Sequence, residues 1–180
     1  PLMHPHFLDL CFYAKSKGMR AVISTNGTLI TRELAKELKK VGLSYVGISL
    51  DELEAVHDRF RGKKGAFREA IDGINYAKEA GIKVGLRFTI NKRNADEIPG
   101  IFKLMEEENI PRVCFYHLVY AGRGTKLMEE DLTHEETRRT VDTILELTKE
   151  IYSRDNQKEV LTVDNHADGP YIYLKLLKEG

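Results

Sequence analysis

The chain has 180 residues, and 28 Lys and Arg residues balance 28 Asp and Glu residues to a formal net charge of zero. This balance argues against a general nucleic-acid binder and against a protein held to an anionic membrane by charge. Hydrophobic residues make up 42% of the chain and charged residues 31%, a composition typical of a folded domain. No apolar run approaches the roughly 18 residues of a spanning helix.

The predicted elements alternate between helices and strands along the chain. The order is a helix at 8–17, a strand at 20–25, a helix at 31–42, a strand at 45–50, a helix at 67–81, a strand at 84–90, a helix around 98–105 and a strand at 113–119. A polar loop at 120–133 then leads into a long helix, which opens with the capping-box pattern of Thr133 and Glu136. The tail adds a short strand at 160–163, a polar turn at 164–170 and a helix at 171–178.

This alternation predicts an α/β fold with a parallel sheet and right-handed crossover helices. A (β/α) barrel and an open doubly wound sheet both satisfy the pattern. We expect one domain over residues 1–155 and a distinct C-terminal segment over residues 156–180.

The two cysteines, Cys11 and Cys114, lie far apart in sequence and within apolar runs. Neither belongs to a CxxC or CxxxCxxC cluster, so the chain alone offers no cysteine cradle for a metal. We expect two buried thiols in a protein of the reducing cytoplasm.

Polar residues follow the ends of the predicted strands, where parallel α/β folds bind their ligands. These residues are Ser24, Thr25 and Asn26, then Ser49 and Asp51, then Arg87, Thr89 and Asn91, and finally Tyr116 and His117 before a glycine-rich loop at 122–124. Such a set suits a polar ligand with hydroxyls, an amine and a carboxylate. The GxSxG, HExxH and GxxxxGK[ST] patterns are absent from the sequence.

Structural roles compete with these functional ones. Asn26 before Gly27 is a strong turn signal, and Asp51 can cap the segment after it. Arg87 lies in a strand expected to be buried, so it needs an acidic partner such as Asp51 or a ligand carboxylate. The charged loop at 57–61 is either a solvated face or a lid that reaches an anionic ligand.

The tail holds a second ambiguous set. His166 and Asp168 belong either to a simple turn or to a site in which a neutral histidine acts as an acid or an axial ligand.

Several runs together resemble the radical S-adenosylmethionine superfamily, in particular its branch with auxiliary clusters. These runs are ISTNGTLI at 23–30, ISLD at 48–51 and HDRFRG at 57–62, together with the opening PLMHP, which resembles the residues after the glycines of the family's GGEP motif. The segment 113–124 resembles the strand and loop that close over the adenine. The tail TVDNHADGPY at 162–171 resembles the haem-pathway members, such as didecarboxysirohaem deacetylase and the haem d1 enzymes.

The resemblance implies a partial (β/α) TIM-like barrel and a defined chemistry. Such enzymes hold a 4Fe–4S cluster on a CxxxCxxC loop and cleave S-adenosylmethionine to a 5′-deoxyadenosyl radical, which abstracts hydrogen from the substrate. In the sirohaem branch, acetate side chains of the tetrapyrrole are lost and methyls remain. This chain lacks the CxxxCxxC loop and the GGE, so the cluster would belong only to a longer parent protein.

The resemblance also assigns roles to individual residues. Pro1 would lie beside the methionine amine, Ser49 would bind the methionine part, and Ser24 and Asn26 would lie near the ribose or the substrate. Asp51 would also belong to the cofactor site. Val119 would touch the adenine through its backbone, His117 would belong to the cofactor site, and Arg87 could meet a carboxylate. The catalytic candidates His166 and Asp168 would face the tetrapyrrole.

The leading hypothesis is therefore the core segment of a radical S-adenosylmethionine enzyme of haem biosynthesis. A non-catalytic module that binds a nucleotide or a tetrapyrrole is the alternative, and a CxxxCxxC and GGE upstream would separate the two. A barrel enzyme for a phosphorylated metabolite, with its phosphate cradle at 122–124, ranks last.

A partial barrel has an exposed sheet edge, which is prone to pair with another chain. We therefore predict that the isolated chain associates with itself. Sedimentation velocity at high concentration checks this, and a clean monomer would count against it.

Overall fold

The computed structural model describes residues 1–50, 52–54, 62–154 and 158–179. The chain divides into two compact units, Pro1–Arg87 and Phe88–Gly180. Asp51 and the charged loop at 57–61 lie outside the described residues. The expected separation of residues 156–180 from the rest stays a prediction.

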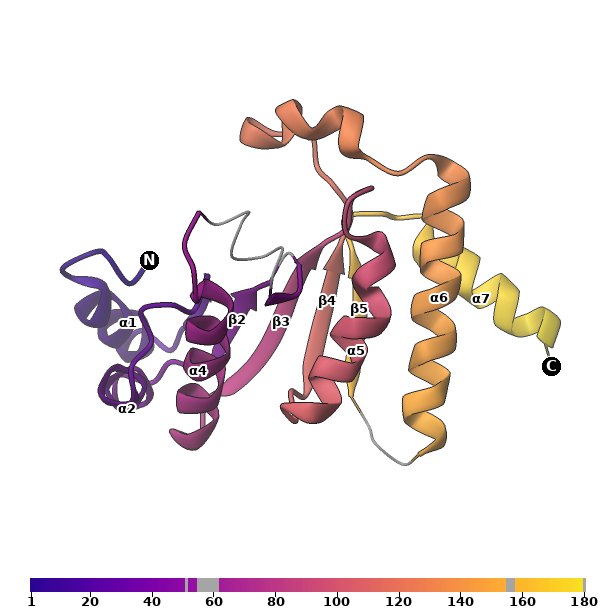
Figure 1. Ribbon diagram of the computed structural model, residues 1–180. Helices are drawn as coiled ribbons and strands as arrows, with labels where there is room; N and C mark the ends of the chain where they lie inside the picture. The colour runs from indigo at the N-terminus through magenta and orange to yellow at the C-terminus, as the bar shows by residue number, and fades with distance from the viewer. Residues whose placement is uncertain (51, 55–61, 155–157, 180) are drawn as a thin grey trace. The chain divides into compact units, whose positions relative to one another are not determined.

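The first unit alternates helices and strands in the expected order (Figure 1). Its elements are α1 (Phe7–Ser16), β1 (Val22–Thr25), α2 (Arg32–Lys40), β2 (Tyr45–Ser49), α4 (Ala66–Glu79) and the start of β3 (Lys83–Thr89). β1 pairs with β2, and β2 with β3, in parallel. The predicted cap of α2 is confirmed, because the Thr31 side chain accepts a hydrogen bond from the Leu34 N–H at 3.2 Å.

The strands of the first unit are covered on one face only. Alternate side chains of a strand point to opposite faces, and the buried set is Ile23, Val46, Ile48, Val84 and Leu86. The other set contains Val22, Ser24, Tyr45, Ser49, Lys83 and Arg87, which are exposed or half-buried. One covered face and one open face match a (β/α) barrel segment and not a doubly wound sheet, which carries helices on both faces.

The second unit continues from the end of β3 with further strand and helix pairs. Its elements are η1 (Ala95–Glu97), α5 (Ile98–Glu107), β4 (Arg112–Tyr116), η2 (Gly122–Glu130), α6 (His134–Ser153), β5 (Glu159–Val163) and α7 (Asp168–Glu179). β4 and β5 pair in parallel. An aromatic cluster forms the core, with ring centroids 5.8 Å apart for Phe88 and Phe115 and 5.7 Å apart for Phe102 and Phe115.

The parallel sheet with crossover helices is confirmed. The five strands have the order β1-β2-β3-β4-β5, so within the described residues β1 and β5 each have one strand neighbour and the sheet is not closed. The capping box of Thr133 and Glu136 is confirmed as well. Boundaries differ from expectation by more than two residues at two places, where β4 ends at Tyr116 before the predicted 119 and α7 begins at Asp168 within the predicted turn. The loop expected at 120–133 contains the 3-10 helix η2.

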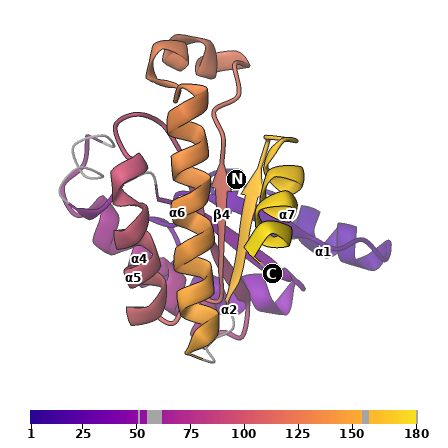
Figure 2. The same cartoon turned by 90° about the vertical axis from the view of Figure 1, so that its right-hand side faces the viewer.

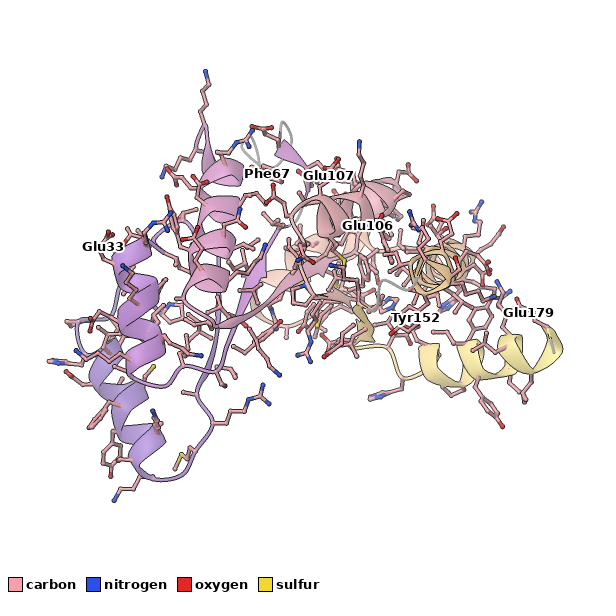
Figure 3. The ribbon with its side chains drawn as sticks, turned by 90° about the horizontal axis from the view of Figure 1, so that it is seen from below. Glu33, Phe67, Glu106, Glu107, Tyr152 and Glu179 are labelled. Atoms are coloured by element: carbon pink, nitrogen blue, oxygen red, sulfur yellow. The ribbon has the colours of Figure 1, made fainter. Side chains whose placement is uncertain are left out.

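α6 and α7, both labelled in Figure 2, are tied together by a small cluster of polar side chains. Asp142 of α6 accepts hydrogen bonds from the Tyr171 hydroxyl and the Lys175 ammonium, each at 2.7 Å. Further along α6, Lys149 donates at 2.5 Å to Glu179, which Figure 3 labels near the end of α7. Burial alone would raise the pKa of Asp142, but the bonds from Lys175 and Tyr171 outweigh it and hold that pKa below its usual range.

The α4 helix approaches the turn after β1 closely, and this contact generates the first fold prediction. A Cβ at Gly73 would lie 2.5 Å from the Gly27 carbonyl oxygen, a backbone atom that cannot swing away. We expect Gly73→Ala to lower the free energy of unfolding by about 1–3 kcal/mol through overpacking. Gly169→Ala is the control, because a Cβ there meets nothing within 4 Å. Urea unfolding measures both, and equal stabilities of the two variants would contradict the close approach.

The Asp142 cluster predicts a defined dependence on pH. A carboxyl whose pKa is lowered on folding stabilises the protein above its unfolded pKa, and this contribution is lost as pH falls through the folded pKa. Asp142→Asn should therefore cost about 1 kcal/mol near pH 7, and the difference from wild type should vanish in acid. Asp164→Asn, at an exposed position, is the matched control. A difference that stays constant from pH 7 to about pH 2 would refute the assignment.

Candidate functional site

The first unit gathers three of the predicted site residues on its open sheet face. Ser24 lies opposite Gly47 in the pairing of β1 with β2, and Ser49 lies opposite Arg87 in the pairing of β2 with β3. Directly opposed residues of neighbouring strands project on the same face. The fold therefore places two hydroxyls and one guanidinium at the carboxyl ends of adjacent strands.

A missing side chain at position 47 makes room for Arg87. A Cβ on Gly47 would lie 2.8 Å from Arg87 Cδ and 3.3 Å from Cγ, so the arginine stem runs across the glycine backbone. The Leu50 N–H donates to the Arg87 carbonyl at 3.1 Å, which anchors the same point of β3 to the segment after β2. Arg87 is half-buried. The sequence predicted a buried strand here, and it missed that a glycine on the neighbouring strand leaves space for the Arg87 stem.

Asn26 and Pro1, two further predicted residues of the first unit, lie outside its helices and strands. The Asn26 Oδ1 accepts from the Thr28 N–H at 3.4 Å and from the Thr28 hydroxyl at 3.2 Å, so the amide oxygen takes part in the turn before α2. Pro1 is exposed, and its carbonyl accepts from the His4 N–H at 2.9 Å. Sequence reasoning missed Glu52, a carboxylate just beyond β2 whose side chain is buried.

The second unit holds a buried histidine and aspartate pair. His117 directly follows β4, and its Nε2 lies 2.8 Å from Asp168 Oδ2 at the first residue of α7. The exposed fractions of the two side chains are 12% and 4%. The other oxygen of Asp168 accepts from the Asn165 amide at 2.7 Å. The sequence named both His117 and Asp168 but did not pair them, and it did not single out Asn165.

His166 lies apart from this pair. Its side chain is exposed on the turn before α7, while Asp168 bonds with His117 and Asn165. Val119 is half exposed, and its carbonyl accepts from the Ala121 N–H at 2.9 Å, which closes the turn before η2.

The cysteines do not form a metal site. Cys11 in α1 and Cys114 in β4 are free and buried, one in each unit. Burial raises the pKa of the Cys11 thiol, which keeps it protonated. Within the part of the chain that the structure describes, no group of three or more His, Cys, Asp and Glu side chains is arranged to hold a metal ion. A 4Fe–4S cluster therefore does not fit on these residues.

None of the described helices combines the length and the apolar character that a membrane crossing requires.

Comparison with known proteins identifies the family. The model of the radical SAM superfamily matches residues 1–105. The chain is 63% identical over 179 residues to Fe-coproporphyrin III synthase of Methanosarcina barkeri. This match covers 99% of this chain and 45% of the relative. It is 38% identical over 173 residues to pre-heme d1 synthase of Dinoroseobacter shibae, covering 96% of this chain and 43% of the relative.

A solved structure supports the fold. The SuiB enzyme of Streptococcus suis, bound to its precursor peptide SuiA, superposes with a TM-score of 0.74 at 20% identity, over 96% of this chain and 38% of SuiB. The chain thus spans less than half the length of each of these three proteins. The expected partial (β/α) barrel and the expected resemblance are both confirmed, and the chain belongs to the radical S-adenosylmethionine superfamily.

Proposed function

We propose that this chain is the core segment of a radical S-adenosylmethionine enzyme of haem biosynthesis that modifies side chains of a tetrapyrrole. Its relatives at 63% and 38% identity carry names from tetrapyrrole synthesis, and both matches run over nearly the whole of this chain. That coverage favours an enzyme segment over a non-catalytic nucleotide- or tetrapyrrole-binding module.

The observation that carries the proposal is Arg87 lying across Gly47 on the open face, with Ser49 opposite it in the strand register. A guanidinium and a hydroxyl at adjacent strand ends suit the carboxylate of an amino acid, because Arg binds carboxylates through paired hydrogen bonds. The methionine part of S-adenosylmethionine carries such a carboxylate. When bound, this cofactor supplies hydrogen abstraction from the substrate.

The other residues would complete the cofactor site. Ser24 and Asn26, at the end of β1, would lie toward the ribose or the substrate, and Pro1 toward the methionine amine. Asp51 is proposed as a cofactor-binding residue from the sequence alone. In the second unit, Val119 would meet the adenine through its backbone and His117 would belong to the same cofactor.

A tetrapyrrole would need a surface that remains accessible once the cofactor is bound. His166 is exposed and is the proposed contact with the macrocycle. Asp168 is buried to 4% exposure, so its contribution would pass through His117. The cluster would be held by residues outside this chain, because the described residues offer no cradle for it.

Two further features of the complete protein are part of the proposal. A cytoplasmic location is supported by the two buried free thiols. Self-association is supported by the single strand neighbour of β1 and of β5 within the described sheet.

The proposal predicts a graded loss of cofactor affinity in the protein reconstituted with its cluster. Arg87→Ala should weaken binding of S-adenosylmethionine about tenfold or more, since hydrogen bonds to charged groups contribute about 1.5–3 kcal/mol. Gly47→Ala should weaken binding in the same direction with little loss of stability, because the closest atom to the new methyl, at 2.8 Å, belongs to the flexible arginine stem, and the next neighbour, Tyr45 Cε1, lies at 3.3 Å.

The matched control is Arg68→Ala, which removes an exposed arginine 3.8 Å from Glu54. We expect its affinity to stay within about twofold of wild type, because a single exposed ion pair contributes little. Equilibrium dialysis under anaerobic conditions measures all three variants. Wild-type affinity and turnover in Arg87→Ala would remove Arg87 from the cofactor site.

A further inference from the structure

The His117, Asp168 and Asn165 side chains form one chain of hydrogen bonds at the end of β4. Asp168 accepts on both oxygens, from Asn165 Nδ2 at 2.7 Å and from His117 Nε2 at 2.8 Å. An ionised carboxylate has acceptors only, and an amide nitrogen has donors only. A carboxylate oxygen paired with Nε2 places the shared proton on His117 Nε2, and in the neutral tautomer with that proton Nδ1 is an acceptor.

The backbone of His117 is fixed as firmly as its ring. The His117 N–H donates to the Val163 carbonyl at 3.0 Å, directly after the last register pair of β4 and β5, Tyr116 with Val163. The Asp168 N–H donates to the Asn165 carbonyl at 3.3 Å, so the turn before α7 also holds Asn165 beside Asp168. Val163 thus fixes the backbone of His117, and Asp168, supported by Asn165, fixes its ring.

One ring nitrogen of His117 is not used by these contacts. Among the described residues, the polar contacts of its side chain involve Nε2 and Asp168 alone. The ring keeps 12% exposure at the carboxyl end of a parallel strand, where this type of fold binds ligands. A neutral imidazole with Nε2 held by a carboxylate presents Nδ1 to a hydroxyl or amine donor.

We propose that Asp168 and Asn165 are positioning residues that hold His117 in its Nε2–H tautomer, so that Nδ1 accepts a hydrogen bond from a hydroxyl or amine of the bound adenosyl group. Only the identity of the ligand rests on the proposed function. The tautomer depends on this chain alone. Asp168 acts through His117 and does not itself touch the ligand, in keeping with its burial.

A neighbouring cavity makes the positioning testable by substitution. A space of about 320 Å³ lies between the first turns of α6 and the start of α7, and Asn165, Ala167 and Asp168 line it together with Thr137, Val141 and Tyr171. Truncation of Asn165 or Asp168 therefore enlarges an existing space and does not open a sealed apolar core, where cavity costs are largest.

The test is the tautomer of His117, measured by long-range ¹⁵N–¹H correlation on the chain labelled at histidine. The wild type should show Nε2–H alone. Asp168→Ala should give a mixture of both tautomers, and Asp168→Asn, whose one carbonyl oxygen is shared between two donors, should give an intermediate population. Asn165→Ala should shift the population less than Asp168→Ala.

Tyr171→Phe is the control for a merely structural role, because it removes the hydrogen bond to Asp142 that also ties α7 to α6. It should lower stability and leave the tautomer unchanged. If Asp168→Ala lowers stability as Tyr171→Phe does and keeps pure Nε2–H, the positioning role is overturned. Should Asp168→Ala not fold, Asp168→Asn decides on the same criterion.

The ligand is tested by adding S-adenosylmethionine to the protein reconstituted with its cluster. The ¹⁵N signal of His117 Nδ1 should move in the direction of an accepted hydrogen bond, and Asp168→Ala should lose this shift and bind about three- to tenfold more weakly. Binding without any change at Nδ1 overturns the acceptor role. A wild type that does not bind S-adenosylmethionine contradicts the proposed function, and the tautomer result then stands separately.

Discussion

The strands of the first unit are buried on one face and open on the other, and the arrangement of the candidate site depends on that constraint. In the first unit the covered face carries Ile48 and Leu86, which have no exposed surface. The intervening positions hold Ser49 and Arg87, which remain half-buried. Because side chains alternate along a strand, burying one set against the helices commits the other set to the open face. A slip of one residue would exchange the two sets.

A glycine in β2 leaves space for a neighbouring side chain on the open face of the sheet. Gly47 has no side chain, and the stem of Arg87 occupies the space that a Cβ would fill. A glycine has a weak intrinsic preference for extended structure, so it lowers the stability of the strand. The packing of its fully buried neighbours Val46 and Ile48 offsets this loss of stability. Stability thus resides on the helix face, whereas the residues proposed to bind the cofactor lie on the open face.

The second unit uses a different device at the end of its strand pair. There a charged side chain is buried, and it is stable because both of its oxygens are hydrogen-bonded, by Asn165 and by His117. Removing either donor leaves a desolvated carboxylate, so the three side chains depend on one another. Such a network fixes the direction of an imidazole more closely than packing alone can.

Local signals predicted much of this fold from the sequence. The alternation of elements comes from hydrophobic spacing, and the caps at Thr31 and Thr133 come from short patterns that depend on near neighbours. The start of α7 was missed because Gly169 and Pro170 suggest a turn, although proline is tolerated in the first turn of a helix.

Contacts between residues far apart in the sequence could not be predicted from the sequence alone. His117 and Asp168 are separated by 51 positions, and their contact depends on the register of β4 with β5, which no single segment encodes. The predicted association of His166 with Asp168 came from closeness in sequence, whereas the helix start directs Asp168 to His117 instead. The half-buried state of Arg87 likewise depends on Gly47 of the neighbouring strand.

The central claim is that the cofactor binds at the carboxyl ends of the strands on the open face. Hydrogen–deuterium exchange of the cluster-loaded protein, with and without S-adenosylmethionine, tests it most directly. We expect slower exchange at the ends of β1, β2 and β3, around 24–27, 48–50 and 86–90, and no change at their starts around 44–45 and 82–83. Protection confined to the strand starts, or to α2 and α4, would contradict it.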